Sequence, residues 1–289
     1  MQASNPKKPL RKKQHQTRPG VESRMQPQPV FDNKQVKGSG KLKNKVAVIT
    51  GGDSGIGRAV AILFAKEDAD IAVIYLNEHK DAKETQHVVE EEYDRQCLLI
   101  AGDLRKESFC NSAIRRIHKT FKSIDILVNN AGLHYEHDCI EGITSEMLSR
   151  TFETNIFSMF YMTKAALHFM PEGSAIINTT SVTAYRGSAH LIDYASSKGA
   201  IVSFTRSLSG SLLEKKIRVN AVAPGPIWTP LIVSSFTPKE VSEHGSDSPM
   251  KRAGQPVEIA PSYLFLACSD SAYMTGQVLH PNGGEIVNG

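Results

Sequence analysis

Short apolar runs alternate with amphipathic stretches from residue 41 onward. The runs are rich in Val, Ile, Leu and Ala, which is typical of strands buried on both faces of a sheet. We predict seven strands, at 46–49, 71–76, 97–101, 124–128, 175–178, 218–222 and 276–279, with helices between them at 58–66, 81–93, 107–121, 145–169 and 194–213. Such alternation indicates an α/β fold, a doubly wound parallel sheet with helices on both faces.

A glycine-rich turn joins the first predicted strand to the first helix. Residues 50–57 read Thr-Gly-Gly-Asp-Ser-Gly-Ile-Gly. Glycine lets the backbone approach a ligand closely, and free N–H groups at a helix N-terminus face an anion. The spacing G-x-x-x-G-x-G differs from that of most dinucleotide folds, and no Walker A lysine follows. The turn predicts a pyrophosphate site in a Rossmann-type fold; a structural turn without ligand is the alternative.

The segment 224–255 interrupts the alternation. It contains five prolines and is longer than most connections in a compact domain. Loops of this length are usually functional, so we predict a lid over a site at the carboxyl ends of the strands. Residues 41–289 then form a single domain.

Charge is concentrated in the first forty residues. Residues 1–40 are rich in Pro and Gln and carry nine Lys or Arg against two acids, a net charge of +7. Because the whole chain is +4, residues 41–289 carry −3, which argues against a nucleic-acid-binding core. We predict a flexible, basic, Pro-rich arm over 1–40, solvated or lying along the body or a neighbouring subunit. A nucleic-acid or membrane-surface role for this arm is the alternative.

Cysteine use and hydropathy bear on location. The four cysteines lie far apart with no C-x-x-C, as expected for free thiols in a reducing compartment. Neither a run of eighteen apolar residues nor a secretory h-region is present. We therefore expect a cytoplasmic protein without a membrane span.

Tyr194 and Lys198 form a candidate proton-transfer pair. They are i, i+4 neighbours on a predicted helix, and an ammonium lowers the pKa of a nearby phenol. This spacing is common by chance, so its context decides. Ser181 ends a strand thirteen positions earlier, where a hydroxyl could hold a substrate carbonyl oxygen or simply form a turn. Asn155, mid-helix, could hold a water beside Lys198 or be a satisfied structural residue.

Six motifs occur in the order and spacing of one family. They are Thr50-Gly51-x-x-x-Gly55-x-Gly57, Asn129-Asn130-Ala131-Gly132, Asn155, Ser181, Tyr194-x-x-x-Lys198 and Pro224-Gly225. Over residues 45–289 the chain resembles the short-chain dehydrogenase/reductase family. The Pro-rich tail, the Gly-Gly-Asp-Ser-Gly-Ile-Gly turn and residues 222–231 are similar to a bacterial aldehyde-reductase-like subgroup that includes general-stress oxidoreductases.

The resemblance implies roles at the matching positions. Tyr194 would be the general acid/base, Lys198 would lower its pKa and hold the nicotinamide ribose, Ser181 would polarise the carbonyl, and Asn155 would position a relay water. Asp103 would bind the adenine amino group. The cofactor contacts implied in all are Gly51, Ser54, Gly55, Ile56, Gly57, Asp103, Leu104, Asn130, Ala131, Gly132, Tyr194, Lys198, Pro224, Gly225, Ile227 and Thr229.

The choice between NADP and NAD depends on the end of the second strand. NAD sites usually offer a carboxylate to the ribose 2′-hydroxyl there. The segment 75–77 has no acid, and Asn77 could approach a 2′-phosphate, so we favour NADP. Glu78, about twenty residues past the glycine turn, could instead play the NAD role.

Three residues are candidates for substrate contacts: His190 and Leu191, just before the tyrosine, and Trp228 in the long loop. His134 and His137 have no third ligand at a recognisable spacing, so we predict pocket or surface histidines and no metal.

The sequence therefore predicts an oxidoreductase that interconverts a carbonyl and an alcohol by hydride transfer with NAD(P)(H). The substrate would be a small aldehyde, ketone or polyol. No nucleic-acid or membrane partner is expected, and family analogy suggests a homo-oligomer, a tetramer. The alternative is a dinucleotide-binding scaffold or regulator without turnover.

Overall fold

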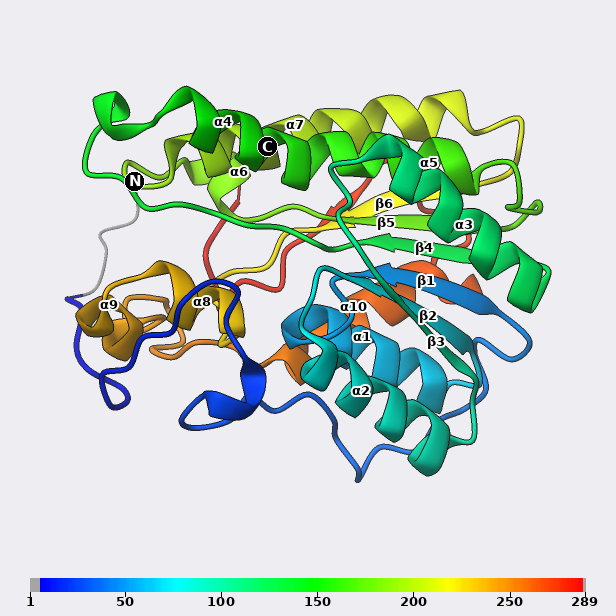
Figure 1. Ribbon diagram of the computed structural model, residues 1–289, viewed down its shortest axis with the longest axis horizontal. Helices are drawn as coiled ribbons and strands as arrows, with labels where there is room; N and C mark the ends of the chain where they lie inside the picture. The colour runs from blue at the N-terminus through cyan, green and yellow to red at the C-terminus, as the bar shows by residue number, and fades with distance from the viewer. Residues whose placement is uncertain (1–5, 288–289) are drawn as a thin grey trace.

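Seven parallel strands form one sheet in the computed structural model, which describes residues 6–287 (Figure 1). The strands are β1 (Val46–Thr50), β2 (Asp70–Tyr75), β3 (Cys97–Ala101), β4 (Ile126–Asn129), β5 (Ala175–Thr179), β6 (Arg218–Val222) and β7 (Val278–Leu279). Their order is β3-β2-β1-β4-β5-β6-β7. The order reverses between β1 and β4, so the crevice that can take a ligand lies at their carboxyl ends. The predicted Rossmann-type fold is confirmed.

Helices cover both faces of the sheet (Figure 1). On one face lie α1 (Gly55–Lys66), α2 (His79–His87) and α10 (Pro256–Ala267); on the other lie α3 (Glu107–Phe121), α4 (Ser145–Phe152), α5 (Ser158–Ala166) and α7 (Ile192–Ser211). Successive side chains of a strand point to opposite faces. In β1, Ala47 and Ile49 accordingly join the core under α1, while Val48 joins the core under α3. This double burial explains the continuous apolar runs in the sequence.

Several predicted elements differ in detail. The helix expected over 145–169 is interrupted by a π-helical stretch, Glu153–Phe157, and the one over 81–93 ends in another, Val88–Glu92. Helix α10 was not predicted at all; two prolines, at its first position and in its interior, weaken the helical signal. The long segment 224–255 is not a simple loop, because it contains α8 (Pro230–Ser235) and α9 (Pro238–Glu243).

The basic arm is packed on the body over its described part, residues 6–40, which is one of the positions expected for it. In Figure 1 it passes α9 and α8 and then runs beneath α1 and α2. Met25 is only 1% exposed and joins the apolar cluster around α8 and α9. Leu10 and Gln16 donate backbone hydrogen bonds to Ser242 and Val233. The arm lacks an apolar period because its described part forms no strand and only one short 3-10 helix, Glu22–Arg24, and is held by single anchors.

No helix among the described residues is long and apolar enough to cross a membrane. Within the same residues, no group of three or more His, Cys, Asp or Glu could hold a metal ion. The four cysteines are all free thiols.

Candidate active site

A cleft of about 650 Å³ opens at the carboxyl ends of the central strands. Its walls come from the glycine turn, from the residues after β4 and β5, from the start of α7 and from the segment before α8. Arg18, Pro19 and Gly20 of the arm also line it. The cleft is therefore built from segments far apart in sequence.

The glycine turn is shaped so that side chains cannot fill it. Gly51 and Gly55 have φ of 64° and 53°, in the left-handed region that favours glycine. A Cβ added at Gly57 would lie 1.9 Å from the carbonyl oxygen of Gly51. The Asn130 Nδ2 donates to the carbonyl oxygens of Thr50 and Gly51, at 3.2 Å each. Asn130 thus holds the start of the turn, and the helix end of the turn offers backbone N–H groups. This arrangement fits the pyrophosphate of a dinucleotide.

Ser181, Tyr194 and Lys198 converge at the other end of the cleft. The Ser181 hydroxyl lies close enough to the Tyr194 phenol to lower its pKa. The Lys198 Nζ lies 5.4 Å from the centre of the Tyr194 ring and donates to the carbonyl oxygen of Thr179 at 2.9 Å. Lys198 is only 2% exposed. The predicted proton-transfer pair and its serine thus lie in one cleft with the glycine turn.

The pKa of Tyr194 shifts opposite to the sequence-based expectation. Burial raises it to about 12, although the Ser181 hydroxyl lowers it. Burial also lowers the pKa of Lys198 to about 7. Desolvation disfavours both charged forms, so the ammonium that was expected to stabilise a phenolate is itself destabilised. At neutral pH the tyrosine is a protonated, neutral donor.

Asn155 lies in the π-helical stretch between α4 and α5 and is fully buried. Its Nδ2 donates to the Leu133 carbonyl at 2.9 Å and to Ser197 Oγ at 3.0 Å. Its Oδ1 accepts from the Leu133 N–H at 2.8 Å. A Cβ added at Gly132 would lie 3.3 Å from this Oδ1 and 3.6 Å from the Lys198 Nζ, so the two groups are neighbours. A π-bulge at such a position is common at functional sites.

Most residues predicted for the site line the cleft. These are Gly51, Ser54, Gly55, Ile56, Asp103, Leu104, Asn130, Ala131, Gly132, Ser181, His190, Leu191, Tyr194, Lys198, Pro224, Gly225, Ile227 and Thr229. Asp103 is held by Arg105, whose Nη2 donates to it at 2.6 Å and whose hydrogen bond lowers the pKa of the carboxyl. Gly57 and Asn155 are not among the described lining residues but adjoin residues that are.

Comparisons with known proteins agree with this arrangement. Residues 51–285 match a family model described as enoyl-(acyl carrier protein) reductase. General stress protein 39 of Bacillus subtilis is 55% identical over 93% of this chain and 94% of its own length. The chloroplastic NADPH-dependent aldehyde reductase 1 of Arabidopsis thaliana is 52% identical over 96% of this chain and 98% of its own. A short-chain dehydrogenase of Burkholderia cenocepacia, solved in complex with NADP, matches with a TM-score of 0.80 and 28% identity over 84% of this chain and 98% of that one.

The chain belongs to the short-chain dehydrogenase/reductase family. Its relatives include the general-stress and aldehyde-reductase proteins that the motifs indicated. It is accordingly an NAD(P)-dependent oxidoreductase of this family, and the glycine turn and the Ser181, Tyr194 and Lys198 cluster are the two ends of its cleft.

Two site predictions are corrected by the structure. Trp228 is not among the described residues that line the cleft. It is fully buried, its Nε1 donates to the Pro27 carbonyl at 2.8 Å, and Arg11 of the arm lies over its ring. Asn77 is exposed and also lies outside the described lining. The single tryptophan thus anchors the arm and is not exposed to the cleft. The backbone after β2 turns Glu78 inward instead of Asn77.

The sequence did not reveal the surroundings of two cleft residues of this short-chain dehydrogenase, Asp53 and His134. Asp53, in the glycine turn, is buried beside Glu78; burial and then Glu78 raise its pKa to about 7. The position of Asp53 inside the glycine-turn motif could have indicated that it lines the cleft. His134 lies edge-on to Tyr194, with ring centres 5.1 Å apart, and burial lowers its pKa to about 3, so it is neutral. Only the tertiary fold reveals this contact, although its place after Gly132 suggested a pocket.

Proposed function

We propose that the protein interconverts an aldehyde or ketone and the corresponding alcohol, with Tyr194 as the general acid/base. The observation that carries this proposal is the juxtaposition of Ser181, Tyr194 and the buried Lys198 in the same cleft as a glycine turn shaped for a pyrophosphate. The relative named as an aldehyde reductase supports the substrate class.

A bound nicotinamide cofactor supplies the hydride; the chain's own residues hold and move the proton. The Ser181 hydroxyl orients the substrate oxygen next to the Tyr194 phenol. Tyr194, kept neutral by burial, donates its proton to that oxygen during reduction and is left as the phenolate. In the oxidation direction it first gives up its proton toward Lys198, and the phenolate then accepts the proton of the alcohol. Lys198, adjacent to Asn155 across Gly132, is placed to return the proton through a water held there. The N–H groups of Ile56 and Gly57 are suited to the pyrophosphate.

The proposal is tested by measuring NADPH and NADH oxidation against a panel of short aldehydes and ketones, and NADP or NAD reduction against polyols. We expect turnover of at least one carbonyl with one of the two cofactors. Cofactor binding without turnover of any panel member, unchanged by Tyr194→Phe, would instead support the scaffold alternative.

We propose that NADP is the favoured cofactor, with a small margin over NAD. A relative is named as NADPH-dependent, and a solved family member holds NADP. Against this, Asp53 of the glycine turn and Glu78 just after β2 both line the cleft, where a carboxylate disfavours an additional phosphate. Partial protonation of Asp53 near neutral pH reduces that repulsion.

Replacing Glu78 with glutamine is expected to raise the ratio of kcat/KM for NADPH to that for NADH by about tenfold, because a like charge next to the 2′-phosphate is removed. In the unmodified protein the same ratio should fall as pH rises from 6 to 8, because Asp53 then loses its proton. Steady-state kinetics with both cofactors measure these effects. Glu84→Gln, at an exposed position of α2, is the matched control. An unchanged ratio in Glu78→Gln would show that Glu78 does not face the ribose.

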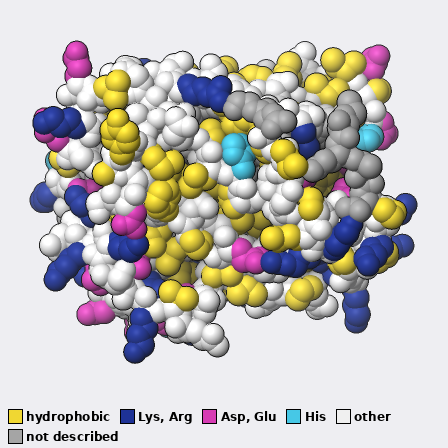
Figure 2. Space-filling view, turned by 180° about the vertical axis from the view of Figure 1, so that it is seen from behind, with side chains coloured by type: hydrophobic (Ala, Val, Ile, Leu, Met, Phe, Trp, Pro, Cys, Tyr) yellow, Lys and Arg dark blue, Asp and Glu magenta, His cyan; other side chains and the backbone are white. Residues whose placement is uncertain are grey.

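The proposal includes a cytoplasmic location and a homo-oligomer, a tetramer by family analogy. In Figure 2, apolar side chains form several groups on the reverse face, with charged side chains between and around them.

A further inference from the structure

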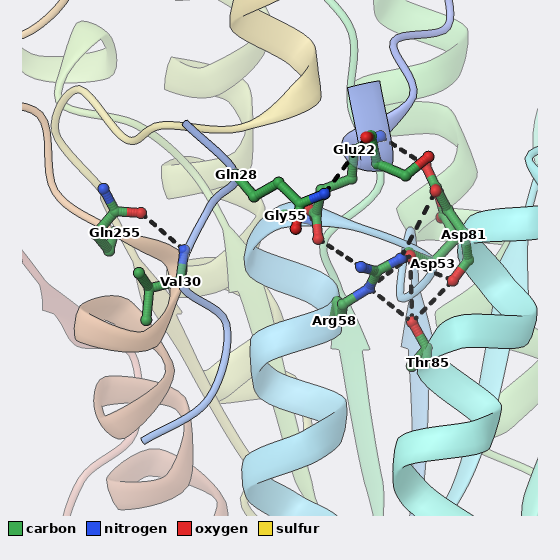
Figure 3. A network of polar contacts seen from close by, with 10 residues as sticks. Glu22, Gln28, Val30, Asp53, Gly55, Arg58, Asp81, Thr85 and Gln255 are labelled. Atoms are coloured by element: carbon green, nitrogen blue, oxygen red, sulfur yellow. Dashed lines mark hydrogen bonds and ion pairs between the residues drawn. The ribbon is translucent and has the colours of Figure 1, made fainter. Parts of the chain in front are cut away.

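One side chain of the N-terminal arm reaches the glycine turn. Glu22, in a short 3-10 helix (Glu22–Arg24), is only 2% exposed (Figure 3). Its Oε2 accepts a hydrogen bond from the N–H of Gly55, the first residue of α1, at 2.6 Å. The carboxylate therefore caps the helix end at which a pyrophosphate is expected to bind.

The other carboxylate oxygen of Glu22 is paired with Arg58 of α1. Its Oε1 lies 2.5 Å from the Arg58 Nη1, and Arg58 is 3% exposed. The same guanidinium donates from Nε and Nη2 to the carbonyl oxygen of Asp53, at 3.0 and 2.7 Å. The pair thus binds the turn at two points: Glu22 accepts from the Gly55 N–H, and Arg58 donates to the Asp53 carbonyl. Figure 3 shows these groups converging from the arm, α1 and α2.

The arm is held on both sides of this contact. The Glu22 N–H donates to Asp81 Oδ2 at 2.8 Å. Further along, the Val30 N–H donates to Gln255 Oε1 at 2.9 Å, and the Val257 N–H donates to the Val30 carbonyl at 3.0 Å. These anchors on α2 and α10 fix where the carboxylate of Glu22 lies.

Glu22 occupies only one of the free N–H groups at the start of α1, so the cap still leaves N–H groups for a ligand. The first N–H groups of a helix have no partner within it. Arg58 N–H already bonds to the Ser54 carbonyl, so Gly55, Ile56 and Gly57 carry the unpartnered groups of this helix. Glu22 takes the first and leaves the next two for an anion. Because its charge is paired with Arg58, it adds little net repulsion toward phosphate.

We propose that Glu22 is a positioning residue for the dinucleotide pyrophosphate: the arm completes the cofactor turn by fixing the Gly55 N–H and, through Arg58, the Asp53 carbonyl. The inference rests on the dinucleotide-binding part of the proposed function and is independent of turnover. Glu22 touches the turn and not the reacting atoms.

Direct titration of the full chain with NADPH and with NADH, followed by the fluorescence of the reduced nicotinamide, tests this. Glu22→Ala is expected to raise the Kd of both by about tenfold, and Glu22→Gln by about threefold, because the amide retains an acceptor but loses the charge. The KM for the carbonyl substrate should stay within about twofold. Lys34→Gln, which breaks the exposed ion pair of the arm with Glu92, is the matched control and should change neither.

A double variant, Glu22→Ala with Arg58→Met, separates positioning from stability. It removes both charges of the Glu22–Arg58 pair and leaves only Asp81, whose Oδ1 lies 3.9 Å from the Arg58 Nη2, without its partner. The thermal midpoint should therefore recover in part relative to Glu22→Ala while the Kd stays raised. Recovery of the Kd together with the midpoint would overturn the proposal and make Glu22 a stabilising contact only, as would an unchanged Kd in Glu22→Ala. Raised Kd values in a protein that turns over no carbonyl would uphold this proposal and refute the proposed activity.

Discussion

Replacing Tyr194 with phenylalanine is expected to lower kcat by about 10²–10⁴-fold and to leave the Kd for NADPH and NADH within about twofold. The phenol is the proton donor that contacts Ser181, and at neutral pH it is fully protonated because burial raises its pKa to about 12. Phenylalanine keeps the ring that packs against His134 and removes only the hydroxyl. Pre-steady-state and steady-state turnover with the best substrate of the panel measure the effect.

Two further variants make this result specific. Tyr273→Phe removes the hydroxyl of a fully exposed tyrosine and should leave kcat unchanged. Lys198→Ala should lower kcat and also weaken cofactor binding, because its buried Nζ lies at the junction of Tyr194 and the wall of the cleft. Near-normal turnover in Tyr194→Phe would refute the role of the phenol, whatever the cofactor affinity.

The parts of this structure that the sequence predicted well are those with local causes. Strand β1 is a continuous apolar run, and the turn after it needs glycine for reasons that its own backbone contains. The Tyr194–Lys198 spacing survives because both residues lie on one helix, α7. Their convergence with Ser181 follows from strand ends meeting at one edge of a parallel sheet.

The parts that could not be predicted depend on contacts between distant segments. The arm has no periodicity, and its position depends on single partners such as Arg58 and the Trp228 ring, more than 30 and 200 residues away. The burial of Trp228 could not be predicted for the same reason, because the arm covers this side chain. The direction of the Tyr194 pKa shift was wrong because the sequence shows a nearby ammonium but not the burial of both groups.

Gly57→Ala is expected to raise the Kd for NADPH and NADH by about 100-fold, the equivalent of losing one or two hydrogen bonds to a charged phosphate. A Cβ at this position would lie 1.9 Å from the Gly51 carbonyl oxygen and 2.7 Å from the Asn130 Nδ2. Both groups belong to the contact in which Asn130, after β4, holds the turn after β1. The methyl group therefore fits only if the turn moves away from α1. Such a shift takes the N–H groups of the helix end out of line with the pyrophosphate. Titration of NADPH fluorescence measures the affinity, and thermal unfolding measures the expected strain of about 1–3 kcal/mol.

Gly210→Ala is the matched control, because it adds the same methyl group to a helical glycine with nothing within 4 Å of the new atom. It should leave cofactor affinity unchanged and stabilise the protein by up to about 1 kcal/mol, since alanine is the better helix former. A cofactor Kd in Gly57→Ala equal to that of Gly210→Ala would mean that the close approach of Gly57 to Gly51 serves packing alone. The pyrophosphate would then have to bind elsewhere in the cleft, and the positioning role of Glu22 would fall with it.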